Sequence, residues 1–321
     1  MGVGGIDQQS AMKCFLGVSS LKKDGQGRDL SFADLTLEQY EEIHSWLADV
    51  EFFKQNRNLS WIVRADCEAI SALLDEATKS VHLRPFPFDT GSAGSERLHL
   101  EANRGFLSYL SSARIYLAYT ELNLKKQYGH DSVHVARFKA ASSKEYDECF
   151  GYRLFDKLRN YAQHCGFPVG AGFHMAGNGD GRTMDVTLHV HFDRKRLLLE
   201  RDVWKSALKA ELEAGTGPIQ ALPLLLEHTD CIMRIARSVE LSCAVELHNA
   251  LAGLRQVMHD YRDETALFAI HKEIGKVEIP GGHDTTYTDE QFPVNVFPII
   301  ERDIPKPASC DADIPPPLMN L

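Results

Sequence analysis

The chain has 321 residues, of which 44% are hydrophobic and 25% are charged, so it is long enough to bury a large core and has an ordinary globular composition. Its formal charge of −10 at pH 7 argues against loose, non-specific binding to nucleic acid, which depends on neutralising phosphates. The odd number of cysteines, their wide spacing and the lack of a CxxC pair argue against a disulfide framework and against a cysteine zinc site. They are Cys14, Cys67, Cys149, Cys165, Cys231, Cys243 and Cys310.

The sequence predicts neither a secretion signal nor a membrane span. Near the N-terminus the longest apolar run is CFLGV at 14–18, and no run in the chain approaches the roughly 18 apolar residues that a span needs. The start MGVGGI has Ile6 where a myristoylation signal has Ser or Thr. We therefore expect a soluble cytoplasmic protein with no membrane partner.

The first 85 residues are predicted to form an N-terminal arm and a helical region. Residues 1–35 are rich in Gly, Asp and Lys and have room for one strand. Thr36 and Gln39 have the spacing of a capping box, which predicts a helix over about 36–57, and a second helix is predicted over about 60–79. The Pro- and Gly-bearing stretch 83–95 predicts a loop at a domain boundary.

Two helices are predicted next. Leucine, isoleucine and phenylalanine recur at steps of three and four over 96–127, which is typical of a long helix that ends at Gly129. Asp131 can cap a second helix that continues to Cys165, where Gly166 and Pro168 stop it.

After Pro168 the hydrophobic period changes from helical to alternating. Residues 169–175 and 184–192 alternate, and NGDG at 178–181 is typical of a hairpin turn, so a β-hairpin is predicted near 168–193. A helix near 202–214 follows. Residues 219–262 have apolar positions every three or four residues and predict one long helix or two helices with a kink.

The predicted fold class is therefore mainly α, with three regions. A helical bundle with an inserted hairpin occupies 86–275, after the N-terminal region 1–85. The remaining residues, 276–321, contain eight of the thirteen prolines when counted from Pro280, which predicts an extended, surface-bound tail.

The stretch LRNYAQHCGFPV at 158–169 is unusually polar for a helix end. On a helical wheel, apolar side chains from Phe150 to Cys165 gather on one side, and Arg159, Asn160, Gln163 and His164 gather on the other. Arg159 and His164 lie about 140° apart around the axis and about 7.5 Å apart along it. A phosphate or a partner helix against this face could contact all four polar side chains.

RNYAQH at 159–164 has an Arg, a polar residue, three more residues and a His, and it resembles the signature of the HEPN superfamily of helical-bundle proteins. The resemblance implies a HEPN-like bundle within about 96–262. Many members are metal-independent endoribonucleases in defence, toxin or RNA-processing systems and act as dimers, and others are non-catalytic nucleotide-binding or scaffolding modules. It thus implies an RNA substrate, a homodimer and a possible regulatory protein partner, with no metal and no cofactor.

Carried onto this chain, the motif implies that Arg159 binds the phosphate, Asn160 orients the site and His164 transfers protons. We add Gln163, Arg153 and Lys157 as substrate contacts. RNA cleavage without a metal needs a base, an acid and a cation for the charge that develops as the 2′-OH attacks the phosphate. Histidine titrates near neutral pH, and arginine presents a planar cationic fork to phosphate oxygens, so the residue types suit this chemistry.

Three alternatives compete with this hypothesis. The polar face can be an ordinary helix end, where His and Arg complement the helix dipole. The bundle can be a non-catalytic interaction or nucleotide-binding module that acts through dimer or partner contacts. Finally, one face of the second hairpin strand and a residue of the first offer carboxylate and imidazole ligands for a metallohydrolase. These are His174, Asp185, His189, His191 and Asp193.

Overall fold

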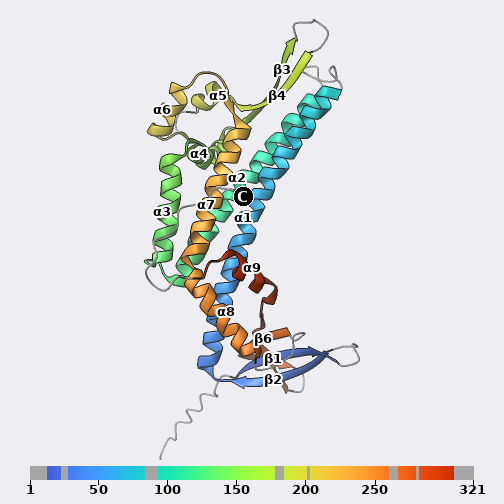
Figure 1. Ribbon diagram of the computed structural model, residues 1–321, viewed down its shortest axis with the longest axis vertical. Helices are drawn as coiled ribbons and strands as arrows, with labels where there is room; N and C mark the ends of the chain where they lie inside the picture. The colour runs from blue at the N-terminus through green and yellow to red at the C-terminus, as the bar shows by residue number, and fades with distance from the viewer. Residues whose placement is uncertain are drawn as a thin grey trace, which may run out of the picture. The chain divides into compact units, whose positions relative to one another are not determined.

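A computed structural model describes residues 13–22, 28–83, 93–177, 184–200, 203–259, 267–279 and 282–306. The described chain is mainly α-helical, as predicted, with antiparallel strands (Figure 1). Its contacts form two compact units. The described residues within 1–54 and 240–315 form what we call the sheet unit, and those within 55–239 form the helical unit. This division falls at other points than the predicted boundaries at 85 and 275.

The sheet unit contains an antiparallel sheet with the strand order β2-β1-β6-β7, in which β8 also pairs with β6. Its strands are β1 (Cys14–Leu21), β2 (Arg28–Leu35), β6 (Leu267–Ile279), β7 (Gly282–Tyr287) and β8 (Glu290–Gln291). Cys14, Leu16 and Val18 alternate along β1 and are buried, which places them on the inner face of the sheet. Where one strand was expected in residues 1–35, the structure has two, and it adds the strand β6 in a region predicted as bundle.

The predicted extended tail is wrong for residues 282–304. After β7 and β8 come a short 3₁₀ helix, η2 (Val294–Val296), and α9 (Phe297–Asp303), whose side chains Phe297 and Ile300 are buried. Pro298 lies in the first turn of α9, where a missing backbone N–H breaks no helical hydrogen bond. The unit also contains α8 (Ala244–His259), where His248 Nε2 lies 3.1 Å from the Ile304 carbonyl.

A single helix, α1 (Leu37–Leu83), replaces the two helices predicted over 36–57 and 60–79. The predicted capping box at its start is confirmed, because Thr36 and Gln39 each accept a hydrogen bond from the other's backbone N–H. The polar side chains in the middle of α1 do not interrupt the helix, because they have hydrogen-bond partners. Asn56 accepts a hydrogen bond from Thr120 at 2.6 Å, and the Ser60 hydroxyl donates to the Arg57 carbonyl.

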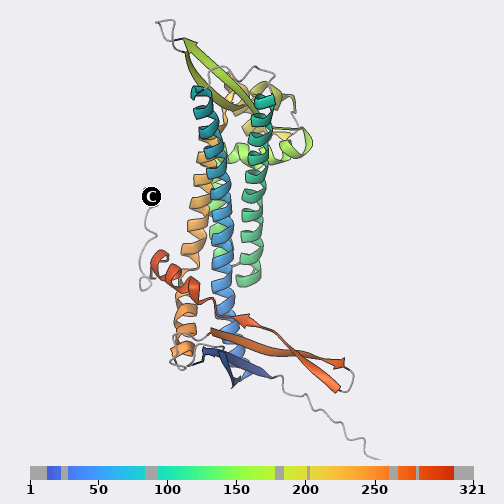
Figure 2. The ribbon, with the colours of Figure 1, turned by 90° about the vertical axis from the view of Figure 1, so that its right-hand side faces the viewer.

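Within the helical unit, α2 (Ala93–Tyr128) lies alongside residues 55–83 of α1 (Figures 1 and 2). It contacts α7 (Ala221–Ser242) through Tyr109, whose hydroxyl lies 2.6 Å from His228 Nδ1. The long helix predicted over 96–127 is confirmed. Gly129, at a φ of 92°, ends α2 as predicted, since glycine adopts this left-handed conformation without steric cost. For residues 219–262, predicted to form one long helix or two helices with a kink, the structure has two, α7 and α8, which meet at Cys243.

The helix predicted to run from Asp131 to Cys165 is also two, α3 (Val133–Glu148) and α4 (Phe150–His164), and its N-cap is Ser132 instead of Asp131. Cys149 between them has an extended backbone. Arg153 donates to the Tyr146 and Asp147 carbonyls, which the end of α3 leaves without helical partners. One side chain from α4 thus stabilises the bend.

The predicted β-hairpin is confirmed as β3 (Val169–Gly177) and β4 (Met184–Phe192), and β5 (Ile219–Gln220) adds a third strand. The predicted turn at 178–181 lies outside the described residues. Two short helices, α5 (Arg194–Leu199) and α6 (Ser206–Ala214), follow the hairpin. No helix in the described part of the chain is long and apolar enough to cross a membrane.

Candidate active site on α4

The helix α4 is amphipathic in the way that the sequence predicts. Leu154, Leu158 and Tyr161 are at most 1% exposed and pack into the core of the helical unit. On the other side, Asn160, Gln163 and His164 are exposed and Arg159 is half-buried. The apolar face fixes the helix, and the motif side chains are left on its outer side.

The four motif side chains have no structural task that the described residues reveal. Within the described ranges, no hydrogen bond or ion pair joins another residue to the side chain of Arg159, Asn160, Gln163 or His164. This distinguishes them from the charged residues one turn earlier, which are engaged in the fold. A polar face that no other described side chain engages is available to an external ligand.

Arg153 and Lys157, predicted as substrate contacts, bind protein groups in this structure. Besides the two α3 carbonyls, the Arg153 guanidinium binds Glu211 of α6, with 2.7 Å between Nη2 and Oε1. Its side chain is only 13% exposed. Lys157 pairs with Asp156 at 2.7 Å and is 17% exposed. Arg153 therefore joins three helices.

The C-terminal end of α4 is held in a defined position. Gly166 has a φ of 118°, as expected for the glycine that ends a helix. Tyr161 stacks on Trp204 with 5.8 Å between ring centroids, and the Trp204 indole donates to the Leu197 carbonyl of α5. Burial raises the pKa of the Tyr161 hydroxyl, and the nearby Arg196 guanidinium offsets part of that rise.

Arg196 is an exposed cation beside the motif that the sequence did not suggest. Its Nη2 lies beside Gly166, so close that an added Cβ there would be 3.4 Å away. The residue belongs to α5, 32 positions after His164, and no local pattern marks it. The fold thus brings a third basic side chain to the end of the helix that carries Arg159 and His164.

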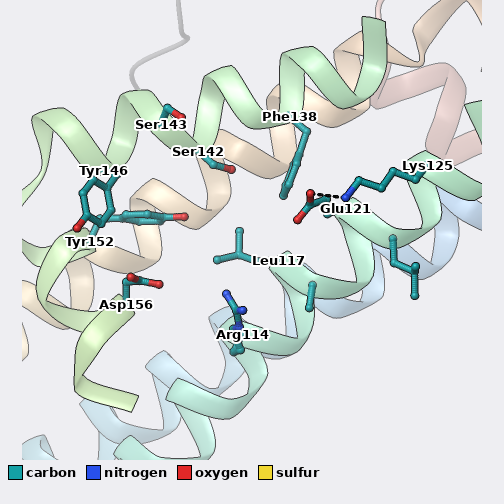
Figure 3. Close-up of a pocket in the computed structure, with 12 residues that line it drawn as sticks. Arg114, Leu117, Glu121, Lys125, Phe138, Ser142, Ser143, Tyr146, Tyr152 and Asp156 are labelled. Atoms are coloured by element: carbon teal, nitrogen blue, oxygen red, sulfur yellow. Dashed lines mark hydrogen bonds and ion pairs between the residues drawn. The ribbon is translucent and has the colours of Figure 1, made fainter. Parts of the chain in front are cut away.

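An open pocket of about 410 Å³ adjoins α4 and lies between α2, α3 and α4 (Figure 3). Leu117 and Phe138 form apolar walls, and Figure 3 shows Arg114 pointing into the pocket from α2. On α4 the pocket includes Asp156, one helical turn before Asn160, so it opens along the same side of the helix as the motif. Sequence reasoning did not find this pocket, because its lining comes from three helices.

A buried polar cluster lies behind α4. His228 of α7 stacks on Phe155 and Tyr152 of α4, with 4.9 and 5.3 Å between ring centroids. Its Nδ1 lies 2.6 Å from the Tyr109 hydroxyl, which also contacts Thr229. Burial lowers the pKa of His228 to about 3, so this imidazole is neutral and acts in packing.

The metal alternative loses part of its ligand set. Asp193 caps α5 by accepting hydrogen bonds from the backbone of Lys195 and Arg196, and the His191 ring lies over Gly170. The side chains of His174, Asp185 and His189 lie outside the described residues. Among the side chains that are described, no group of three or more histidines, cysteines or carboxylates could hold a metal ion.

Comparison with family models, curated proteins and solved structures finds no match for this chain.

The charge distribution adds a second observation about the site. Residues 1–54 and 240–315 contain 11 Lys and Arg against 23 Asp and Glu, a net charge of −12, and residues 55–239 contain 24 against 22, a net charge of +2. The motif thus belongs to the unit that repels phosphate least.

Proposed function

We propose that α4 carries the active site of a metal-independent endoribonuclease of HEPN type. The observation that supports this most is the outer face of α4, where Arg159 and His164 flank Asn160 and Gln163 and none of the four is engaged by another described residue. Free polar side chains on a helix whose other face is buried suit a site for an external phosphate.

In the proposed reaction the 2′-OH of the RNA attacks the adjacent phosphorus. The O2′–P bond forms, the P–O5′ bond breaks, and a proton moves from the 2′-OH to a base while another reaches the leaving oxygen from an acid. His164 performs one of these transfers, and Arg159 stabilises the negative charge that develops on the phosphate. The second transfer requires another His164, which a homodimer supplies. Asn160 orients the phosphate.

The substrate would reach beyond the motif in two directions. Gln163 and Arg196 can contact the backbone near the C-terminal end of α4. In the other direction the pocket next to Asp156 can accept a neighbouring nucleotide, with Arg114 toward a phosphate and the apolar walls toward the base. Lys157 can join these contacts only by leaving Asp156. The RNA would thus lie along one side of α4.

The test is cleavage of mixed cellular RNA by the purified protein in EDTA. Replacing His164 by Ala is expected to lower the rate by about a hundredfold or more, because proton transfer is lost. His130→Ala is the matched control, since His130 is also exposed in the helical unit and lies outside the motif. Cleavage by the His164 variant at the wild-type rate would refute the assignment, provided that circular dichroism shows both variants folded.

A second candidate is a non-catalytic dimerisation module, which a different observation favours. The outer face of the sheet exposes 69% of Leu30 and 64% of Phe32, both on β2. In the described sheet β2 pairs only with β1, so its other edge offers backbone groups to another strand. A second copy of this chain presents the same edge and the same apolar side chains, which allows a symmetric contact. Sedimentation of a Phe32→Asp variant tests this candidate.

A further inference from the structure

Two buried cysteines from distant parts of the sequence meet at the start of α4. The Sγ atoms of Cys149 and Cys231 lie 3.1 Å apart, although the residues are 82 positions apart. Cys149 is 7% exposed and lies at the bend between α3 and α4, and Cys231 is fully buried on α7. A disulfide bond has an S–S distance of about 2.05 Å, so a movement of about 1 Å would join them.

A charged pair borders the two thiols. Arg234 binds Glu145 through two hydrogen bonds, of 2.8 and 2.6 Å, and its Nη2 also lies 3.2 Å from the Cys231 sulfur. Burial raises the pKa of Glu145, but the hydrogen bonds from Arg234 outweigh it and hold that pKa below its usual value. The guanidinium is therefore beside a carboxylate and a sulfur, where it can also stabilise a thiolate.

We infer that Cys149 and Cys231 are a site of reversible oxidation, and that a peroxide converts them into a disulfide that ties the start of α4 to α7. The structure already joins these elements at the adjacent turn, where the Gly151 N–H donates to Glu227 at 3.0 Å. A disulfide here would therefore strengthen an existing contact and not create a new one. It would fix the helix that carries the motif.

The chemistry balances with hydrogen peroxide as the oxidant. The Cys231 thiol loses its proton, the thiolate attacks one peroxide oxygen, and the O–O bond breaks. A sulfenic acid and a hydroxide ion result, and the hydroxide takes up the released proton to become water. The Cys149 thiolate then attacks the Cys231 sulfur, the S–O bond breaks, and a second water leaves. Two thiols and one peroxide thus give one disulfide and two waters.

Burial makes the reaction slow in the closed structure. It raises the pKa of both thiols, so each is protonated at neutral pH and shielded from the oxidant. Cys165 at the other end of α4 is half-exposed and will react first. For this reason the test is best made in a Cys165→Ser background, where the exposed thiol cannot compete.

The experiment treats the full chain with hydrogen peroxide, quenches it, and alkylates the remaining thiols in denaturant before peptide mapping. We expect a Cys149–Cys231 peptide lighter by two hydrogen atoms than its reduced form, which dithiothreitol abolishes. Hydrogen exchange over residues 150–164 should slow in the oxidised protein. The control Cys14→Ala, which removes another buried thiol, should leave the cross-link unchanged.

Replacing Cys149 by Ser should remove both the cross-linked peptide and the slowing of exchange. If this variant does not fold, the peptide mapping of the protein that retains both cysteines still tests the inference. The inference is overturned if peroxide oxidises other thiols while Cys149 and Cys231 are still recovered as alkylated thiols, or if the cross-link leaves exchange in α4 unaltered. Neither outcome depends on whether the protein cleaves RNA.

Discussion

At the scale of single residues, the core of the helical unit contains a histidine that must stay neutral. His228 is stacked between aromatic rings of α4, and its burial lowers its pKa from the usual 6.5 to about 3. Because the unfolded chain takes up a proton near pH 6.5 and the folded chain does not until about pH 3, the unfolded state binds more protons within this window. The free energy of unfolding therefore falls as the pH falls.

We predict that wild-type protein loses roughly 3 kcal/mol of its free energy of unfolding between about pH 7 and about pH 4 through this histidine alone. The measurement is denaturant unfolding at each pH for wild type and for His228→Gln. The variant starts less stable but should show a shallower dependence on pH. Parallel curves for the two proteins would show that His228 is not the group responsible.

The residues of the candidate site differ in how far the sequence identifies them. Arg159 and His164 are recognisable because the motif and the helix period place them on one face. Arg196 and Arg114 come from other helices and are identified only by the fold. Arg153 has the right charge and spacing for a substrate contact. The neighbouring sequence does not indicate that its guanidinium binds the α3 carbonyls and Glu211.

At the scale of elements, long uninterrupted periods and turn residues predict well. The helix α2 and the β3–β4 hairpin follow from apolar spacing that lasts over many residues. No proline marks the bend at Cys149, and the nearest glycine, Gly151, lies inside α4. The polar middle of α1 looks like a break, although Thr120 of α2 supplies a hydrogen bond to Asn56 there. Helix boundaries that depend on tertiary hydrogen bonds cannot be predicted from the local sequence.

The attachment of the hairpin to α2 depends on one buried amide. Asn103 is fully buried, and its side chain accepts from the Val169 N–H at 3.1 Å and donates to the Val169 carbonyl at 3.0 Å. It therefore pairs with the first residue of β3 as a neighbouring strand would. Removing it leaves two backbone groups buried without these partners.

Replacing Asn103 by Ala is expected to lower the free energy of unfolding by about 2 to 5 kcal/mol, since each unsatisfied buried group costs about 1 to 3 kcal/mol. Asn123→Ala is the matched control on the same helix, because among the described residues its half-buried amide bonds only the Tyr119 carbonyl. Its cost should stay near 1 kcal/mol or below. Equal losses in both variants would contradict the special part given to Asn103.

At the scale of the whole molecule, the sheet unit combines a strongly acidic composition with an exposed apolar sheet face. Acidic charge opposes the approach of RNA, and exposed aromatic side chains favour another protein surface. Phe15 and Phe32 contact each other on that face, with 6.5 Å between ring centroids, and His271 borders Phe32. The two units thus suit different ligands.

If this face joins two copies of the chain, Phe32→Asp should shift the sedimentation coefficient to that of a monomer by adding a charge at the contact. Leu199→Asp is the control, since Leu199 is 78% exposed in the helical unit. Wild-type protein that sediments as a monomer at all concentrations would exclude the sheet-face dimer. A dimer that survives Phe32→Asp would place the contact elsewhere. Such a dimer would still supply the second His164 that the proposed cleavage needs.

The sheet unit is built from both ends of the chain. Lys272 pairs with Glu41 and His44 with Glu290, so each of these earlier residues waits for a partner that is made 231 or 246 positions later. A ribosome adding about 5 to 20 residues per second needs roughly 10 to 40 seconds to cross the helical unit between them. During that interval the helical unit can complete its core. The strand β1 can already pair with β2, but it still lacks β6, which pairs with its other edge. The order of synthesis therefore leaves the β6-facing edge of β1 open while the helical unit is made, and a chaperone that binds apolar strands would find its target in β1 and β2.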